Sequence, residues 1–126
     1  MKLISDRLHE VVLFNVDKEL TFTKDIIIEA LRRDFIQESI NRRTWSGELQ
    51  QIGDTFSDPL IIDFRKRAFE IIEYYWIDNI LYGMIKILDT PNGKILESCI
   101  DKVSFKIKGL YNASFSKLII STFVAY

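Results

Sequence analysis

The chain has 126 residues, 48% of them hydrophobic and 13% aromatic, with a formal net charge of −1. This composition excludes a disordered chain and a strongly basic nucleic-acid-binding domain, and it predicts one globular domain over residues 1–126. No apolar run reaches the roughly 18 residues of a membrane span, and the first residues lack the pattern of a signal peptide. One histidine, His9, and one cysteine, Cys99, exclude an internal disulfide and a Cys/His zinc site, so neither a metal nor another cofactor is expected.

The charge is distributed unevenly. Residues 102–126 contain no acid and four lysines, whereas residues 1–101 carry thirteen basic and eighteen acidic side chains. The four lysines are Lys102, Lys106, Lys108 and Lys117. Such a basic tail fits an acidic partner surface or DNA, but the simpler interpretation is a solvated strand face on which lysines protect an edge from aggregation.

The first half of the chain predicts a strand and a helix. Glu10–Val16 is a β-branched and aromatic run, which is typical of a strand. Thr21 or Thr23 can cap a helix that runs to about Arg43. The apolar positions of this helix follow helical spacing and form one stripe: Ile27, Ile28, Leu31, Phe35 and Ile40.

The second half predicts mainly strands. Residues 44–59 form a polar loop, and strands are expected over 60–64, 68–76 and 81–88, with a hairpin turn at Asp78-Asn79. A short helix from Lys94 to about Ile100 and two closing strands, 103–108 and 117–125, follow. Glu70 and Glu73 stand three apart on a predicted strand and therefore face opposite sides, which argues against a carboxylate pair. The pattern therefore predicts an α+β fold.

Several segments also stand in the order and spacing of a known family. They are Gly47-Glu48-Leu49, Glu73-Tyr74-Tyr75-Trp76, Leu81-Tyr82-Gly83, the run I-L-D-T-P-N-G-K-I-L from Ile87 to Leu96, and Val103–Leu110. Together they resemble the prohead maturation proteases of tailed bacteriophages over about residues 14–125. The resemblance implies a herpesvirus-assemblin type of fold, a mainly antiparallel β-barrel with two packed helices.

The positions that the resemblance assigns to catalysis hold other residues here. The family's general base is the histidine of G-E-L-x-H, and this position falls on Gln51, whose amide nitrogen is not basic. Aligning Lys108-Gly109-Leu110 with the family's R-G-L places Lys106 and Ile107 on the two serines, one of which is the nucleophile. A shift of two residues would bring in Ser104 as a fallback nucleophile, still opposite Gln51 and without a base. The resemblance therefore implies a pseudo-protease with no catalytic residues.

Other reactive residues are interpreted as structural. His9 stands before the first predicted strand and outside the matched segments, and Cys99 on its predicted helix is expected to be a small core residue. Glu48 is retained from the motif and is expected to cap or pair. The residues expected as possible interface anchors are Trp45, Tyr74, Tyr75, Tyr111, Lys102, Lys106 and Lys108, although for any single aromatic a place in the core is favoured.

By analogy with its family, the chain is expected to be a non-catalytic phage head protein. It would bind the major capsid protein or other head proteins as an auxiliary, decoration or internal component, with a homo-oligomer possible and no membrane partner. Its expected location is the virion head, after assembly in the host cytoplasm. Two alternatives stay open: an active maturation serine protease that uses Ser104 to cleave capsid or scaffold proteins, and a nucleic-acid or assembly-regulating module built on Lys102–Lys117.

Overall fold

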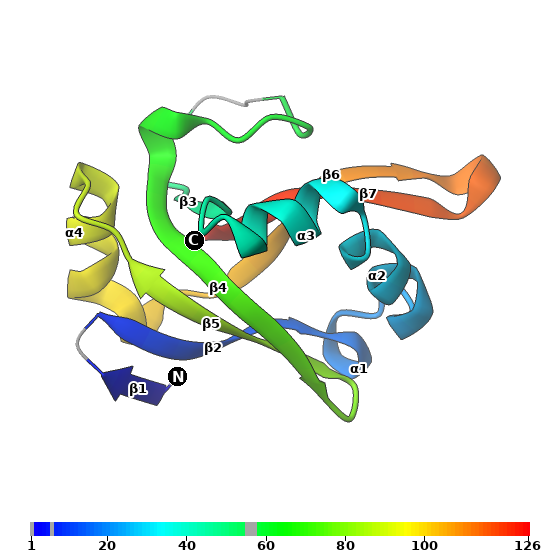
Figure 1. Cartoon of the computed structure of the whole chain (residues 1–126), viewed down its shortest axis with the longest axis horizontal. Coiled ribbons are helices and arrows are strands. Elements are labelled where there is room, and N and C mark those ends of the chain that lie inside the picture. Colours follow the sequence, from blue (N-terminus) through cyan, green and yellow to red (C-terminus); the bar gives the residue numbers. More distant parts are fainter. Residues whose placement is uncertain (1, 6, 55–57) are drawn as a thin grey trace.

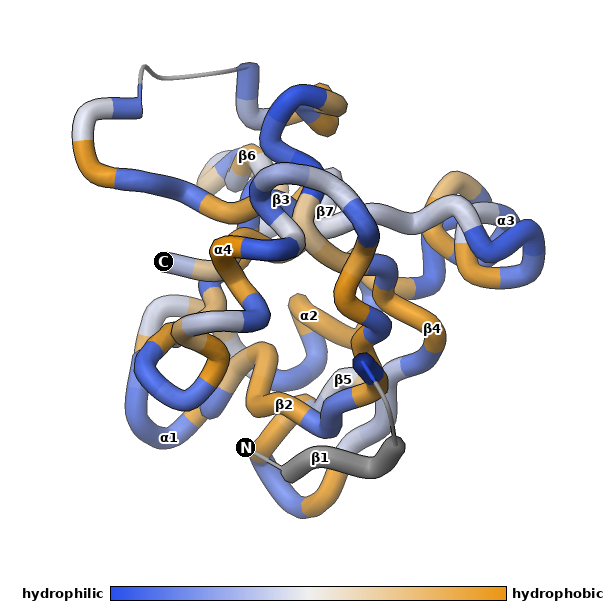
Figure 2. The backbone as a smooth tube through the Cα atoms, turned by 90° about the vertical axis from the view of Figure 1, so that its left-hand side faces the viewer, coloured by the Kyte–Doolittle hydropathy of each residue, from blue (hydrophilic) through white to orange (hydrophobic). Residues whose placement is uncertain are grey.

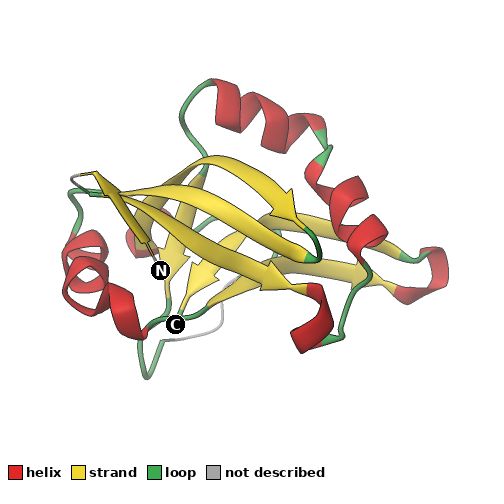
Figure 3. Ribbon diagram, turned by 90° about the horizontal axis from the view of Figure 1, so that it is seen from below, coloured by secondary structure: helices red, strands yellow, loops and turns green. Residues whose placement is uncertain are grey.

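The computed structural model describes residues 2–5, 7–54 and 58–126, and their strands form one sheet. The strand order is β1-β2-β5-β4-β3-β7-β6, and every described pairing is antiparallel except that of β3 with β7. Figure 3 shows this sheet as one curved surface with the helices around its rim. The strands are β1 Lys2–Ser5, β2 Leu8–Asn15, β3 Ser46–Leu49, β4 Arg67–Ile77, β5 Ile80–Ile87, β6 Phe105–Asn112 and β7 Lys117–Ala125.

Three α-helices of eight or nine residues and one α-helical turn of four residues accompany the sheet in the described ranges. They are α1 Val16–Glu19, α2 Lys24–Leu31, α3 Asp34–Asn41 and α4 Pro91–Cys99, and the 3-10 turns are η1 Phe64–Lys66, η2 Ile100–Lys102 and η3 Ala113–Phe115. Figure 1 shows α4 at one end of the molecule and the β6–β7 hairpin extending from the other. None of the helices in these ranges has both the length and the apolar character of a membrane span.

The predicted closed barrel is wrong, although the α+β class and the mainly antiparallel pairing are confirmed. The sheet is open, because β1 and β6 are its two edge strands and no ladder joins β6 to β1 or β2 in the described part of the chain. Val11 and Leu13 of β2 and Phe105 of β6 nevertheless lie in the same apolar core. Side-chain packing therefore bridges the seam that a closed barrel would bridge with backbone hydrogen bonds.

The predicted long helix is two helices. Thr23 caps the first, accepting a hydrogen bond from the Ile26 N–H (3.3 Å), but the backbone leaves the helical region at Arg33 (φ −59°, ψ 142°). After the break Ile36 is fully buried and Phe35 is half exposed. In an unbroken helix Phe35, four residues after Leu31, would lie on the same buried face as Leu31. The break places Ile36 on the buried side instead.

Five predicted strands are confirmed with small shifts of their ends, and one is wrong. β2, β4, β5, β6 and β7 occupy the predicted runs, the turn at Asp78-Asn79 joins β4 to β5, and α4 begins three residues before the predicted Lys94. Residues 60–64 are not a strand, and the predicted loop over 44–59 contains β3. β1 was not predicted at all. β2 and β4 contribute several residues to the apolar core, and Figure 2 shows stretches of hydrophobic colour along both strands.

Candidate functional site

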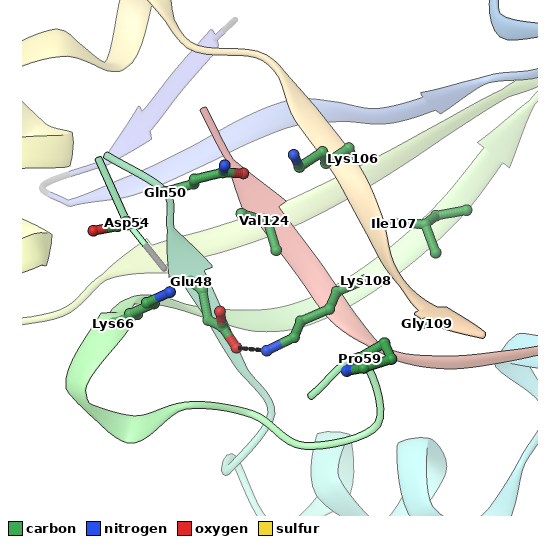
Figure 4. A pocket seen from close by; sticks show the side chains of 10 residues that line it. All are labelled: Glu48, Gln50, Asp54, Pro59, Lys66, Lys106, Ile107, Lys108, Gly109 and Val124. Atoms are coloured by element: carbon green, nitrogen blue, oxygen red, sulfur yellow. Dashed lines mark hydrogen bonds and ion pairs between the residues drawn. The ribbon is translucent and has the colours of Figure 1, made fainter. Parts of the chain in front are cut away.

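The candidate site is a cleft on the outer face of β3, β7 and β6. Its volume is about 370 Å³. Glu48 of β3 pairs with Val124 of β7, which pairs with Lys106 of β6, so these three side chains stand in one row across the strands. Figure 4 shows the lining residues: Glu48, Gln50, Asp54, Pro59, Lys66, Lys106, Ile107, Lys108, Gly109 and Val124.

The motif glycine explains how β3 reaches this place. Gly47 pairs with Phe69 of β4, and a Cβ at Gly47 would lie 2.0 Å from the Phe69 ring. Only a glycine lets the ring pack against the β3 backbone on the inner face. The neighbouring Glu48 then points to the outer face, because successive strand residues alternate.

A buried ion pair occupies the cleft. Lys108 Nζ lies 2.6 Å from Glu48 Oε2, and the two side chains are only 10% and 3% exposed. The same carboxylate oxygen accepts the Asp63 N–H (2.9 Å), and Lys108 also donates to the Ile61 carbonyl (2.7 Å). These contacts offset the cost of removing both charges from water. The expectation that Glu48 pairs is confirmed, and the Lys108 ammonium has no lone pair with which to act as a base.

The structure separates Gln51 from the other predicted degenerate positions. Lys106 and Ile107 line the cleft, but Gln51 turns toward the start of α4, where its side chain donates to Asn92 Oδ1 (2.9 Å). Its backbone N–H donates to Asp54 Oδ2 (2.7 Å). The neighbouring Gln50 lies in the cleft instead, because residues 48 and 50 share one face of the extended chain.

No hydrolytic unit lines the cleft in the described part of the chain. Its described lining residues include no serine, threonine, cysteine or histidine, the side chains that most often act as nucleophile or base in acyl transfer. Nor do three His, Cys, Asp or Glu side chains gather as a metal site among the residues described. The cleft can bind and orient a polar or charged group, but these residues supply no activated nucleophile.

Ser104 lies outside this cleft. It lines a second cavity of about 450 Å³ between β2 and the start of β6, and its backbone N–H and carbonyl pair with Tyr126 (3.0 and 2.9 Å). Lys18, Glu19 and Asp101 line the same cavity, but across the described residues no hydrogen bond connects Ser104 Oγ with any of them.

His9 and Cys99 do not complete a catalytic unit with Ser104 in the described ranges. His9 is buried on β2, and this burial lowers the pKa of its imidazole, with Asp101 and Glu97 acting in the opposite direction. The Cys99 thiol, which is not in the core, donates to the Ile95 carbonyl of its own helix (3.2 Å). Neither side chain forms a hydrogen bond with Ser104 in the part of the chain that is described.

The predicted interface anchors divide into buried and exposed residues. Trp45 is fully buried, so its assignment to an interface is wrong, and Lys108 is held in the ion pair. Tyr74 and Tyr75 are half-buried, their hydroxyls bonded to Leu31 or Gln37 and to Glu10. The remaining three are partly or fully exposed: Lys102, Lys106, which lies over the Tyr126 ring, and Tyr111, which lies against Phe22.

The sequence interpretation missed the segment that crosses the cleft. Ser121 of β7 donates to the Pro59 carbonyl (2.7 Å), and Glu48 and Lys108 bind the same segment further along. Nothing in the sequence marks Ser121. The ion pair did have a signal, because Glu48 keeps the charge of G-E-L and Lys108 keeps the charge of R-G-L.

Comparison with solved structures identifies the fold. The structure of the bacteriophage T4 capsid assembly protease, gp21, superposes with a TM-score of 0.61 and 18% sequence identity, covering 94% of this chain and 76% of that one. No protein-family model and no curated protein sequence matches the chain significantly. At this level of identity the likeness concerns the fold, and the predicted prohead-protease-like fold is confirmed.

Proposed function

We propose that this chain is a non-catalytic phage head protein that keeps a capsid-protease fold and binds the capsid shell as an auxiliary, decoration or internal component. The observation that carries the proposal is the cleft, where the described lining residues offer the Glu48–Lys108 ion pair and include no serine, threonine, cysteine or histidine. A fold does not preserve an activity whose reacting groups are missing. The expected setting is the phage head.

The test combines a binding measurement with a hydrolysis measurement. The purified chain, incubated with the capsid and scaffold proteins of the phage that encodes it, should leave both uncut. The same chain should co-purify with intact heads in amounts typical of a structural component. Absence from heads would refute the proposal, and so would cleavage that depends on a residue of this chain.

The second candidate is an active maturation protease, which the fold of gp21 favours. Ser104 would be its nucleophile, and Lys18, Glu19 and Asp101 are the ionisable side chains of the same cavity. Loss of a nucleophile lowers turnover by about 10⁶ in serine proteases. Ser104→Ala should therefore abolish any cleavage, while Ser98→Ala on the exposed side of α4 serves as the control. An unchanged cleavage pattern in Ser104→Ala would exclude this candidate.

A further inference from the structure

The segment Asp58–Lys66, here called the strap, crosses the cleft and is held there through its backbone. Three polar side chains of the sheet bind it. Ser121 Oγ donates to the Pro59 carbonyl (2.7 Å), Lys108 Nζ donates to the Ile61 carbonyl (2.7 Å), and Glu48 accepts the Asp63 N–H (2.9 Å). Figure 4 shows two of these side chains, Glu48 and Lys108, beside the strap at Pro59. This anchoring uses the backbone of the strap at Pro59, Ile61 and Asp63.

The large apolar side chains of the strap point outward. Leu60, Ile61 and Phe64 are 47%, 60% and 75% exposed, whereas Ile62 packs against the core. Three large apolar side chains exposed to this extent within five residues form a ridge, which differs from the scattered apolar residues of an ordinary surface. Since a solvent-exposed apolar ridge gains nothing in the isolated chain, it points to a surface that covers it.

The strap is also ordered before any partner arrives. Asp58 Oδ1 accepts the Leu60 N–H (2.9 Å), and Asp63 Oδ1 accepts the Arg65 N–H (3.0 Å). Hydrogen bonds from the Arg65 side chain and backbone lower the pKa of the Asp63 carboxyl, which stays ionised at neutral pH. A ridge fixed in this way loses little conformational entropy on binding.

The charge beside Phe64 is positive on its outer side. The Asp63 side chain is 12% exposed, while that of its partner Arg65 is 89% exposed. Arg67 lies over the Phe64 ring, 5.6 Å from its centroid. The surface offered to a partner is therefore apolar at Phe64 with guanidinium groups beside it, and the complementary surface is an apolar groove edged by carboxylates.

We propose that the strap is the docking surface of the chain, with Phe64 as its anchor, and that it inserts into an apolar, acid-edged groove of the capsid shell protein. This assignment rests on the proposed function, which supplies the shell as partner. The exposed apolar side chains and the anchoring of the strap locate the contact. The guanidinium groups beside Phe64 indicate the chemistry of the partner's surface.

The test uses empty shells from the phage that encodes the chain, assembled without it, in a quantitative co-sedimentation assay. Phe64→Ser should weaken binding at least tenfold, as an interface anchor does. Phe115→Ser on η3 is the matched control, because Phe115 is 78% exposed and lies at the far hairpin. It should bind within about twofold of wild type.

A third variant tests the anchoring. Ser121→Ala removes the bond to Pro59 while its own carbonyl still accepts the Trp45 indole N–H. With one of its three anchors to the sheet removed, the strap is less ordered before binding, so affinity should fall about threefold. Thermal unfolding of each variant verifies that it folds.

Two outcomes would overturn the inference in distinguishable ways. If wild type fails to sediment with the shells, the assigned partner fails, and the co-purification with heads described above decides whether the proposed function fails with it. If wild type sediments and Phe64→Ser sediments equally well, the proposed function is supported but the strap is not the docking surface. The same conclusion follows if Phe115→Ser is the variant that loses binding.

Discussion

Two buried regions meet at β7 and are stabilised in different ways. On the inner face Trp45 is fully buried beside Phe123, with ring centroids 6.1 Å apart, and its one polar atom donates to the Ser121 carbonyl. On the outer face Glu48 and Lys108 are buried as charges. Apolar burial contributes residue by residue, whereas a buried charge contributes only while its partner is present.

Because of this difference, the inner face of the sheet stabilises the fold, whereas the outer face determines which chemistry is possible. The inner face needs shape and apolar area, which many sequences provide, so two chains of 18% identity can share this fold. The outer face needs particular reacting groups. There the chain has a closed ion pair and a strap. Ser121 connects the two faces, because its backbone carbonyl accepts the Trp45 indole N–H and its hydroxyl donates to the Pro59 carbonyl.

The largest expected effect tests the inner face. Trp45→Ala removes a fully buried indole and leaves a cavity, so the free energy of unfolding should fall by about 3–5 kcal/mol. Urea denaturation followed by circular dichroism measures this change. Trp76→Ala is the control, because Trp76 is only half-buried with Lys24 over its ring, and it should lose less. Equal losses would mean that burial does not distinguish the two sites.

The sequence predicted the elements better than it predicted how they meet. Runs of apolar, β-branched and aromatic residues located β2, β4, β5 and β7. β3 was assigned to a polar loop because its four residues contain only one large apolar side chain, Leu49. A bulge between Ile71 and Glu73 also defeats the period of two. Glu70 and Glu73 consequently pair with Lys86 and Met84, which share one face of β5, so their predicted separation to opposite faces is wrong.

The cleft was less predictable than the strands. It depends on the parallel pairing of Glu48 with Val124, two residues 76 positions apart, and no local pattern encodes such a contact. Local alternation does explain one detail afterwards. It places Gln50 rather than Gln51 beside Glu48 in the cleft.

The second prediction tests the outer face. Lys108→Met leaves the Glu48 carboxylate buried without its cation and should lower the free energy of unfolding by about 3 kcal/mol. The double variant Glu48→Leu with Lys108→Met removes both charges and should lose less than this single variant, as measured by the same denaturation. If the losses in free energy of unfolding of Glu48→Leu and Lys108→Met simply add in the double variant, the pair is not coupled. The contrast between the two faces would then disappear.

The smallest expected effect concerns His9, a buried side chain outside both regions. Burial lowers the pKa of its imidazole below 6.5, and Asp101 and Glu97 offset part of this change. Between the folded and unfolded pKa values the unfolded chain binds more protons, so this contribution to stability is complete above about pH 6.5 and declines as the pH falls. His9→Gln should remove that part of the pH dependence, measured as the urea midpoint at pH 7.5 and 5.5.

Because carboxylates titrate in both proteins, only the difference between the two slopes reports on His9. A steeper slope for the glutamine variant would show that the folded state favours the charged imidazole, and then the acids, not burial, would govern this site.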